Sequence, residues 1–501
     1  MPNAFKHGAS RPRVPARSSD GGSAPEAPLP DKAEDLGRWY DEVLERAELI
    51  DVRYGVKGFV VYRPNAMRIV KRVYSMFERE LEARGHSPML LPLVIPMANF
   101  RRETEHVKGF EDQVFYITEA GGKPLNEKLI VRPTSETAIY PMMALWIHSY
   151  KDLPLKLYQS VAVYRYETKA TRPLLRGREF LWIETHDAFE DERGALAQIK
   201  EDLEVARRVY ESLGLAFLVV EREPYDKFPG AESSYAYDAL LPNGTVLQIA
   251  TTHYLGEHFT RAFEVTFVDR EGNRRRPHTT CFGIGISRTL AALIMTHGDR
   301  YGLVLPFGLS VHDVVIVPIV QGGSAEGVLS KARRLEEELG AAGFNVHLDD
   351  SEDTPGDKFY RWEMLGVPVR LEVGRREVEG GYVTLFRRDT RERERVADAD
   401  LVRRVGELAR EILDNLRRRA WDRLAESVAD ARTREDVVRL AREGRIIRAN
   451  FCGEEECARA IKEETGYEVR GRRIDVDERP TGNCAWCGRP AKRVVYMAKA
   501  Y

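Results

Sequence analysis

Two periodicities of apolar residues divide the first part of the chain into helices and strands. Between residues 64 and 84 apolar side chains recur at helical spacing, with Pro64 in the first turn and Gly85 after the last, which predicts a helix. Similar patterns predict a helix at 191–213, a helix that begins near Ser287, and strands at 89–95, 155–167, 180–189, 245–252 and 262–268. Because the strands follow one another with few helical crossovers, we expect an α+β fold with a mostly antiparallel sheet.

The pattern changes near Ser310, where strands begin to alternate with helices. The later part predicts strands at 311–320, 344–348 and 369–373 and helices at 325–342 and 400–427, which together indicate a compact α/β unit. The first residues are rich in Gly, Ser and Pro and predict a disordered tail. We therefore divide the chain into a tail (1–33), an α+β domain (34–309), an α/β domain (310–410) and a small α+β C-terminal domain (411–501).

Composition narrows the class of protein only slightly. The 501 residues are 43% hydrophobic and 31% charged, with a net charge of −2, so any polyanion partner must be bound by local basic patches. No apolar run approaches the ~20 residues that span a bilayer. Five cysteines in so long a chain do not form a disulfide framework. We expect a cytoplasmic protein without membrane contacts.

The stretch from Arg165 to Phe180 has the composition of a nucleotide site. On a predicted strand, Arg165 and Glu167 would point to the same face, where they could hold a phosphate and an amino group. The following loop carries further basic residues, among them Arg176, and Phe180 offers a ring on which a purine can stack. Arg-x-Glu alone could equally be a surface salt bridge.

A second half of this nucleotide site is predicted about 110 residues later, where Gly283 and Gly285 lead into a helix with Arg288 in its first turn. The glycines permit close approach of a ligand to the backbone. A structural turn is the ordinary interpretation of Gly-x-Gly by itself. The combination with the Arg-rich loop is much more specific.

Four cysteines near the C-terminus predict a structural zinc site. Cys452 and Cys457 form one pair, and Cys484 and Cys487 form a second, closer pair. Paired cysteines are typical of tetrahedral Cys₄ zinc, which leaves no open coordination position for catalysis. The alternative is a set of four reduced core cysteines. The fifth cysteine, Cys281, has no obvious base partner and is interpreted as a core residue.

These motifs resemble motifs 2 and 3 of class II aminoacyl-tRNA synthetases, and the helix at 64–84 with the strand around Pro92 resembles motif 1, which forms the dimer interface in that class. The order and spacing of further segments resemble prolyl-tRNA synthetases of the archaeal and eukaryotic type over about residues 34–501. The segments are 129–137, 171–176, 178–182, 227–231, 247–256 and 295–299.

The resemblance implies a function and a set of site residues. The family joins L-proline to tRNA(Pro) through a prolyl adenylate, with ATP and Mg²⁺, as a homodimer. Its proline-binding residues correspond to Thr134, Glu136, Arg165 and His253, with Phe228 as a further wall. Its ATP-binding residues correspond to Arg165, Glu167, Arg176, Phe180, Gln248, Thr251 and Arg288, of which Arg165, Glu167 and Arg288 are expected to act in catalysis. Thr134 also fits a helix-capping pattern.

The resemblance makes three further predictions about parts of the chain outside the ATP site. Residues 310–410 resemble an anticodon-binding domain, in which Lys358, Phe359, Arg370 and Arg375 are candidates for contacts with anticodon bases. The family's C-terminal tyrosine, here Tyr501, folds back towards the active site. The interval from Phe180 to Gly283 is too short for an editing domain, so no editing in cis is expected.

The chain departs from the family at two places, and two rival functions stay open. Residues 282–288 are closer to the bacterial form of motif 3, and Trp182 to Asp187 differs from the usual Gln-Glu-Gly-His segment. One rival is a class II synthetase for another small amino acid such as threonine. Threonine enzymes hold a catalytic zinc on Cys and His, and the catalytic region here offers only Cys281. The other rival is a catalytically inactive, synthetase-like RNA-binding protein, which the complete set of ATP-site residues disfavours.

Overall fold

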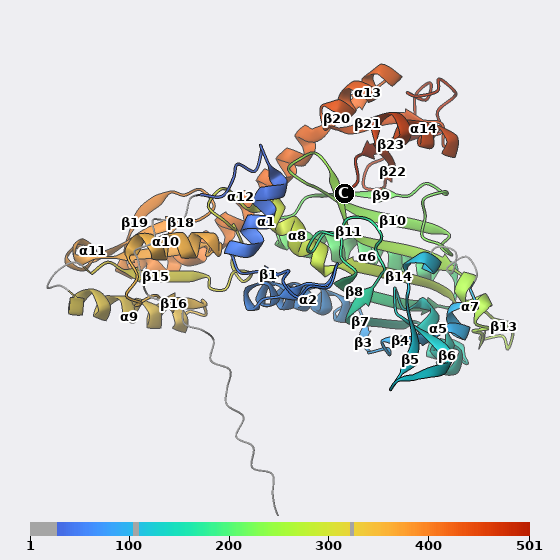
Figure 1. Ribbon diagram of the computed structural model, residues 1–501, viewed down its shortest axis with the longest axis horizontal. Coiled ribbons are helices and arrows are strands. Elements are labelled where there is room, and N and C mark those ends of the chain that lie inside the picture. Colours follow the sequence, from blue (N-terminus) through green and yellow to red (C-terminus); the bar gives the residue numbers. More distant parts are fainter. Residues whose placement is uncertain (1–27, 104–109, 321–324) are drawn as a thin grey trace, which may run out of the picture.

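The computed structural model describes residues 28–103, 110–320 and 325–501. It consists of a body built on one large sheet, a second unit beside the body and a C-terminal lobe (Figure 1). The green strands of the large sheet form the body. A second, smaller sheet with its helices lies to one side in yellow and orange, and the red C-terminal residues form a lobe above the body. The α+β class predicted from the strand pattern is therefore confirmed.

The centre of the large sheet consists of six strands whose neighbours are all antiparallel. In spatial order they are β9 (Phe217–Glu221), β10 (Ser233–Leu240), β11 (Val246–Gly256), β14 (His278–Gly285), β8 (Glu179–Phe189) and β7 (Leu155–Tyr164). The short strand β3 (Ser87–Pro88) pairs in parallel with β7 and ends the sheet on that side.

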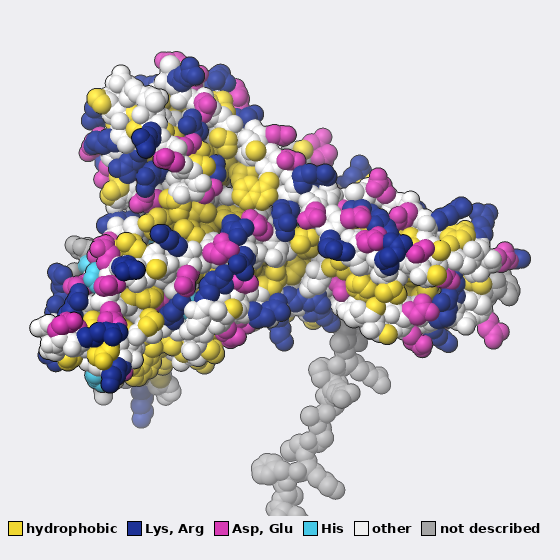
Figure 2. All heavy atoms as spheres, turned by 180° about the vertical axis from the view of Figure 1, so that it is seen from behind, with side chains coloured by type: hydrophobic (Ala, Val, Ile, Leu, Met, Phe, Trp, Pro, Cys, Tyr) yellow, Lys and Arg dark blue, Asp and Glu magenta, His cyan; other side chains and the backbone are white. Residues whose placement is uncertain are grey.

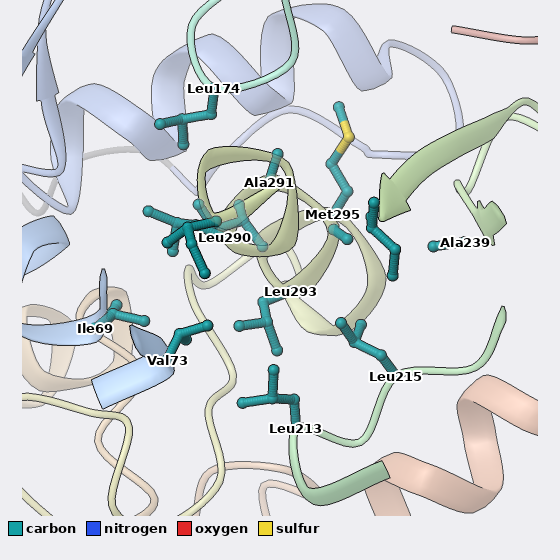
Figure 3. Packing of buried hydrophobic residues seen from close by; sticks show 14 of the residues in the cluster. Ile69, Val73, Leu174, Leu213, Leu215, Ala239, Leu290, Ala291, Leu293 and Met295 are labelled. Carbon is teal, nitrogen blue, oxygen red and sulfur yellow. The ribbon is translucent and has the colours of Figure 1, made fainter. Parts of the chain in front are cut away.

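Three helices bury the main core against this sheet. Helices α6 (Glu192–Ser212) and α8 (Ile286–His297) pack on the strands, and α2 (Pro64–Glu82) packs on both helices. Figure 3 shows Leu293 of α8 next to Val73 of α2 and Leu213, with Leu290 further along α8, and all four side chains are fully buried. Since every residue of α8 except Arg288 is buried, its first turn is held in a fixed place against the sheet.

The large sheet continues without interruption into the C-terminal lobe and reaches eleven strands. The added strands, from β9 outward, are β22 (Glu468–Arg473), β23 (Arg493–Ala498), β21 (Ile446–Phe451) and β20 (Val428–Ala431), accompanied by α13 (Arg434–Arg442) and α14 (Glu455–Thr465). The C-terminal lobe is thus joined to the catalytic strands by a β-ladder as well as by side chains.

The second sheet has five strands in the order β16-β15-β17-β18-β19, parallel at first and antiparallel after β17. Its strands are β15 (Val314–Pro318), β16 (Val346–Leu348), β17 (Val369–Val373), β18 (Tyr382–Arg387) and β19 (Arg393–Ala397). Its helices are α9 (Ala325–Ala341), α10 (Pro355–Met364), α11 (Arg375–Gly380) and α12 (Leu401–Ser427). The alternation predicted after Ser310 is present.

Smaller elements complete the body around the cavity described below. They are α1 (Leu36–Arg46), β1 (Ile50–Asp51), β2 (Val61–Tyr62), β4 (Val94–Pro96), α3 (Met97–Phe100), β5 (Phe115–Ala120), β6 (Lys123–Val131), α5 (Glu136–Trp146), α7 (His258–Ala262), β12 (Phe267–Val268) and β13 (Arg274–Arg275). Strands β4, β6 and β5 form a three-stranded sheet that precedes α5.

Two strand predictions were wrong in detail. The segment predicted as one strand at 89–95 is extended chain apart from its last two residues, which belong to β4; β3 ends before it, and the prolines of this region cannot donate to a ladder. The segment at 262–268 consists mainly of the end of α7 and a turn, with only β12 extended. The predicted tail lies outside the described residues up to residue 27. Residues 28–33 differ from that prediction, since Leu29 is buried and Lys32 donates to the Gly298 carbonyl.

The surface mixes both signs of charge. Figure 2 shows Lys and Arg interspersed with Asp and Glu over the whole visible face, while hydrophobic side chains gather between the C-terminal lobe and the body. This mixture agrees with a net charge of −2. In the described part of the chain, no helix combines the length and apolar character needed to span a bilayer.

Candidate active site

A cavity of about 730 Å³ lies where β8, β11 and β14 meet the loops around α5 and motif 2. Ten residues predicted from the sequence line it: Thr134, Glu136, Arg165, Glu167, Arg176, Phe180, Gln248, Thr251, His253 and Arg288. The structure thus brings together every predicted nucleotide and amino-acid residue. Their individual roles remain predictions.

Arg288, in the first turn of α8, is a partly buried cation that lines the cavity. Its Nε donates to the Leu175 carbonyl at 3.1 Å and its Nη1 to the Gln248 carbonyl at 3.0 Å. Burial, followed by the charges of Arg165 and Arg176, lowers the pKa of Arg288 to about 10. No carboxylate of the described residues forms an ion pair with it. A buried cation with only carbonyl partners is suited to bind an external anion.

Of the two glycines in the Gly-x-Gly pattern before α8, Gly285 is the one at which the backbone approaches a neighbour closely. A Cβ atom on Gly285 would lie 3.0 Å from the Ile249 carbonyl oxygen, and one on Gly283 would meet the Trp182 ring at 3.5 Å. Gly285 is also the residue that precedes the first turn of α8. The close approach therefore fixes the position of Arg288 relative to β11.

Arg165 lies in the middle of the cavity, surrounded by aromatic rings. Its guanidinium carbon is 5.1, 5.3 and 5.5 Å from the ring centroids of Phe110, Phe180 and Trp182, and its Nε donates to the Pro133 carbonyl. Burial lowers its pKa to about 10, against the opposing effect of Glu136 and Glu184. Phe180 is thus in contact with Arg165 as well as available to a base.

The proposal that Arg165 and Glu167 share one face of a strand was wrong. Strand β7 ends at Tyr164, and the Glu167 backbone N–H donates to the Arg165 carbonyl in a tight turn. Glu167 is therefore directed to Arg176, with Oε2 3.8 Å from Nε, while Arg165 is directed to the buried carboxylates. Both side chains line the cavity all the same.

The other basic residues of the motif 2 loop mostly hold the loop in shape. Arg172 forms an ion pair with Asp41, and the Arg178 guanidinium stacks 4.1 Å above the Tyr166 ring. Arg176 donates to the carbonyl oxygen of Tyr501 at 2.8 Å. The predicted return of Tyr501 towards the active site is therefore present in the structure.

A pair of buried carboxylates, Glu136 and Glu184, also lines the cavity; both affect the pKa of Arg165, whereas neither is among the charges that affect the pKa of Arg288. The Thr134 hydroxyl donates to Glu136, so Thr134 does not cap α5, and the cap residue Ser135 makes no capping bond either. Glu184 accepts from the Ser135 backbone N–H at 3.2 Å and from Gln159 Nε2 at 2.6 Å. Because both carboxylates are buried, they are suited to bind a cation.

The two carboxyl groups differ in pKa because their neighbours differ. Burial and the charge of Glu184 raise the pKa of Glu136. Burial would also raise the pKa of Glu184, but His186, 3.4 Å away, lowers it together with Ser135 and Gln159. The same interaction raises the pKa of His186 despite burial. Glu184 is thus the carboxylate of the pair that is held in its charged form.

Glu184 and Trp182 are cavity residues that we did not predict, although Trp182 to Asp187 was identified as atypical. Both line the cavity, and Trp182, Glu184 and His186 alternate along β8. That alternation places them on one face of the strand. It is a sequence signal that could have found them.

A neutral, largely apolar wall lies beside the carboxylates. The rings of His253 and Phe228 stack at 4.6 Å with an interplanar angle of 28°, and His253 Nδ1 is 2.8 Å from the Ser234 hydroxyl oxygen. Burial, with a smaller effect of Arg222, lowers the pKa of His253 to about 3. An imidazole that stays uncharged can contact a saturated ring without repelling a nearby cation.

The four C-terminal cysteines also come together. Their Sγ atoms all lie within 4.8 Å of one another, with 3.8 Å between Cys457 and Cys484 and 3.7 Å between Cys452 and Cys487. Sulfur atoms at ~2.3 Å from a tetrahedral zinc are ~3.8 Å apart. The residues therefore fit a tetrahedral metal ion. It is the one such group found among the described residues.

Two of the candidate anticodon contacts are structural. Lys358 is buried and donates to the carbonyls of Asp349 and Ser351, and Arg370 is buried between Glu363 and Glu372. The Arg370 guanidinium also stacks 3.8 Å from the Phe359 ring. These side chains stabilise the second sheet and leave little surface for bases.

The fold and the cavity define a class II aminoacyl-tRNA synthetase. Residues 116–297 match the class II tRNA synthetase core domain (G, H, P, S and T), and residues 313–408 match the anticodon binding domain. Residues 434–501 match the C-terminal domain of prolyl-tRNA synthetase. The chain belongs to the proline–tRNA ligase family.

Similar proteins cover nearly the whole chain. A proline–tRNA ligase of Thermofilum pendens is 54% identical over 94% of this chain and 98% of its own length, and one of Methanopyrus kandleri is 43% identical over 95% and 98%. The solved structure of Giardia lamblia prolyl-tRNA synthetase in complex with prolyl-adenylate matches with a TM-score of 0.92 at 33% identity, covering 95% of this chain and 100% of that one.

The carboxylate pair leads to a prediction for Glu184→Gln. We expect the KM for a cationic amino-acid substrate to rise by about tenfold or more, since a hydrogen bond to a charged group is lost, while the KM for ATP changes little. The measurement is ATP–pyrophosphate exchange with each substrate varied in turn. Glu201→Gln is the matched control, because Glu201 pairs with Lys156 outside the cavity. An unchanged amino-acid KM in Glu184→Gln would contradict the assignment.

Proposed function

We propose that this chain activates L-proline with ATP and transfers it to tRNA(Pro). The observation that carries the proposal is the division of one cavity into a carboxylate end beside an apolar wall and an end that presents the buried cation Arg288. Prolinium has a secondary ammonium group on a saturated ring, which these carboxylates and the His253–Phe228 wall complement. The names of the relatives, and the prolyl-adenylate in the Giardia structure, support the same substrate.

The two steps follow from positioning and charge. The proline carboxylate attacks the α-phosphorus of ATP, the bond to the β-phosphate oxygen breaks, and pyrophosphate leaves. Arg165 stabilises the charge that develops on the α-phosphate, and Arg288 binds the γ-phosphate. A terminal ribose hydroxyl of the tRNA then attacks the adenylate carbonyl, and AMP leaves. Orientation in the cavity supplies the rate, so no protein nucleophile is required.

Mg²⁺ belongs to this proposal as a partner of the phosphates. Glu167 lines the cavity at the motif 2 loop with its side chain 26% exposed, and Gln248 lies on the facing strand. The Glu167 carboxylate offers oxygen atoms of the kind that Mg²⁺ prefers, whereas the Gln248 amide oxygen already accepts from Arg222. The ion would neutralise phosphate charge as pyrophosphate departs.

The rival functions have less support. A threonine enzyme would hold a catalytic zinc on Cys and His, whereas Cys281 is paired with the buried Glu136, which together with burial raises the pKa of its thiol. An inactive RNA-binding protein would not need the complete set of cavity residues. The interval from Phe180 to Gly283 consists of strands and helices of the main sheet, which supports the proposal that there is no editing domain in cis.

We further propose that the chain is a cytoplasmic homodimer, with the motif 1 region at its interface. Leu90 and Leu93 lie in the segment between β3 and β4 that we assigned to motif 1, and they are 77% and 44% exposed. Large apolar side chains exposed together suggest an interface. The division at 34–309, 310–410 and 411–501 is proposed with it, since each of the three family matches lies within one of these ranges.

The direct test of the proposed function is ATP–pyrophosphate exchange with a panel of amino acids. Proline should support exchange with the highest kcat/KM, because it fits both the carboxylates and the apolar wall. Alanine has two carbons fewer than proline and should be rejected by the lost contacts alone, since each missing methylene lowers kcat/KM by about 10- to 200-fold. Faster exchange with threonine or cysteine, or exchange with none of the amino acids, would contradict the proposal.

We propose that the four cysteines bind zinc, and the number of zinc ions per chain tests this proposal. We expect one zinc per chain in the purified protein and loss of zinc in Cys484→Ser, because three ligands hold the ion much more weakly than four. Cys281→Ser is the matched control and should keep its zinc. Metal content is measured by mass spectrometry. Absence of zinc from the wild type, or loss of zinc in the control, would contradict the assignment.

A further inference from the structure

Strand β22 of the C-terminal lobe brings one arginine, Arg470, into contact with Arg222, which lines the cavity. In the pairing of β22 with β23 the register shifts between Val469 and Gly471, so Arg470 is an extra residue in its strand. A β-bulge of this kind changes the direction of a side chain. Gly471 permits it, since its φ is +126° and a Cβ atom would lie 2.0 Å from the Glu221 carbonyl oxygen of β9.

The redirected guanidinium forms a buried ion pair with Asp238 of β10. Nε and Nη2 of Arg470 donate to the two carboxylate oxygens of Asp238 at 2.7 and 2.9 Å, and the residues are 6% and 1% exposed. Burial opposes the charged form of Asp238, but Arg470 and then Arg222 hold the pKa of its carboxyl below the usual range. The two partners are far apart in sequence and belong to different units, so the pair ties the lobe to the catalytic strands.

Arg222 extends this pair to a residue that lines the cavity. Its Nη1 donates to the Arg470 carbonyl at 3.3 Å and its Nη2 donates to Gln248 Oε1 at 2.5 Å. Nη2 is also 3.9 Å from Asp238. Asp238 and Gln248 are cross-strand partners next to a second register shift, which puts their side chains on one face. A continuous contact path therefore joins Arg470 to Gln248.

The path determines which end of the Gln248 amide faces the cavity. A guanidinium only donates, so the oxygen of the amide must face Arg222 and the NH₂ group is left to point elsewhere. An NH₂ group can donate to ribose or phosphate oxygens of a nucleotide. If Arg222 were displaced, the amide could turn and present its oxygen, which nucleotide oxygens repel.

We propose that Arg470 is a positioning residue for ATP, acting through Asp238 and Arg222 to hold the NH₂ group of Gln248 towards the nucleotide. The inference rests on the proposed function, because it takes the nucleotide end of the cavity to bind ATP. It gives the C-terminal lobe a part in nucleotide binding that is separate from its metal site.

The chain offers a matched control on the same strand. Arg472 of β22 forms an ion pair with Glu221 of β9, so it also joins the lobe to the body. This pair is 50% and 29% exposed and lies outside the cavity lining. Loss of the Arg472–Glu221 pair therefore weakens the contact between the C-terminal lobe and the body, as loss of Arg470 does, but leaves the contacts of Gln248 unchanged.

The test compares Arg470→Met with Arg472→Met in two assays. We expect Arg470→Met to weaken binding of the ATP analogue AMP-PNP about tenfold in calorimetry. It should raise the KM for ATP in ATP–pyrophosphate exchange by the same factor, because one charge-assisted hydrogen bond to the nucleotide is lost. The KM for proline should stay unchanged, and Arg472→Met should match the wild type. Added to Gln248→Ala, Arg470→Met should have no further effect, because both act through one amide.

Three results would overturn the inference: unchanged AMP-PNP affinity in Arg470→Met, an equal loss in Arg472→Met, or a full additional loss in the Gln248→Ala background. If Arg470→Met does not fold, Arg470→Lys keeps a cation beside Asp238 but has no fork, and it should still raise the KM for ATP. Wild-type ATP affinity in that variant would be equally contradictory. Failure of the proposed function differs from all of these, since the wild type would then give no exchange with proline.

Discussion

The structure depends on keeping two guanidinium groups, those of Arg165 and Arg288, largely out of water without a carboxylate in direct contact. Burial lowers the pKa of both to about 10, and their hydrogen bonds within the chain go to backbone carbonyls. Burying a cation in this way is unfavourable until an anion arrives. The cavity is therefore built for a substrate that brings several negative charges, and a nucleoside triphosphate meets that requirement.

The continuous sheet is what keeps this arrangement in place. Adjacent antiparallel strands β8, β11 and β14 carry the carboxylate, the amide and the glycine turn at fixed separations, and α8 buries its whole circumference behind Arg288. The C-terminal lobe extends the same sheet and contributes two contacts, from Arg470 towards Gln248 and from Tyr501 to Arg176. Residues from distant parts of the chain can therefore act on one substrate.

Much of the fold and of the cavity was predictable from local sequence patterns. The features that were not predictable depend on turns, burial and strand pairing that local patterns do not show. Apolar periodicity predicted most helices and strands, and basic and Gly-rich motifs identified residues that line the cavity. The error at 165–167 arose because a strand was extended beyond Tyr164, where a tight turn separates the two side chains. Lys358 and Arg370 were assigned to the anticodon because charge suggests exposure, but tertiary partners bury them. The Arg470–Asp238 pair depends on a bulge and on strand pairing across the chain, which no local pattern reveals.

The most direct test of this account is to measure how Arg288→Met binds AMP-PNP and adenosine, each by calorimetry. If the Arg288 guanidinium binds phosphate groups, its loss should lower the affinity only for ligands that carry phosphates. The account predicts that AMP-PNP affinity falls by about 10- to 100-fold, the range expected for a hydrogen bond to a charged group, while adenosine affinity matches the wild type. Equal losses for both ligands, or no loss for AMP-PNP, would contradict the claim that the cavity is organised around an unpaired buried cation.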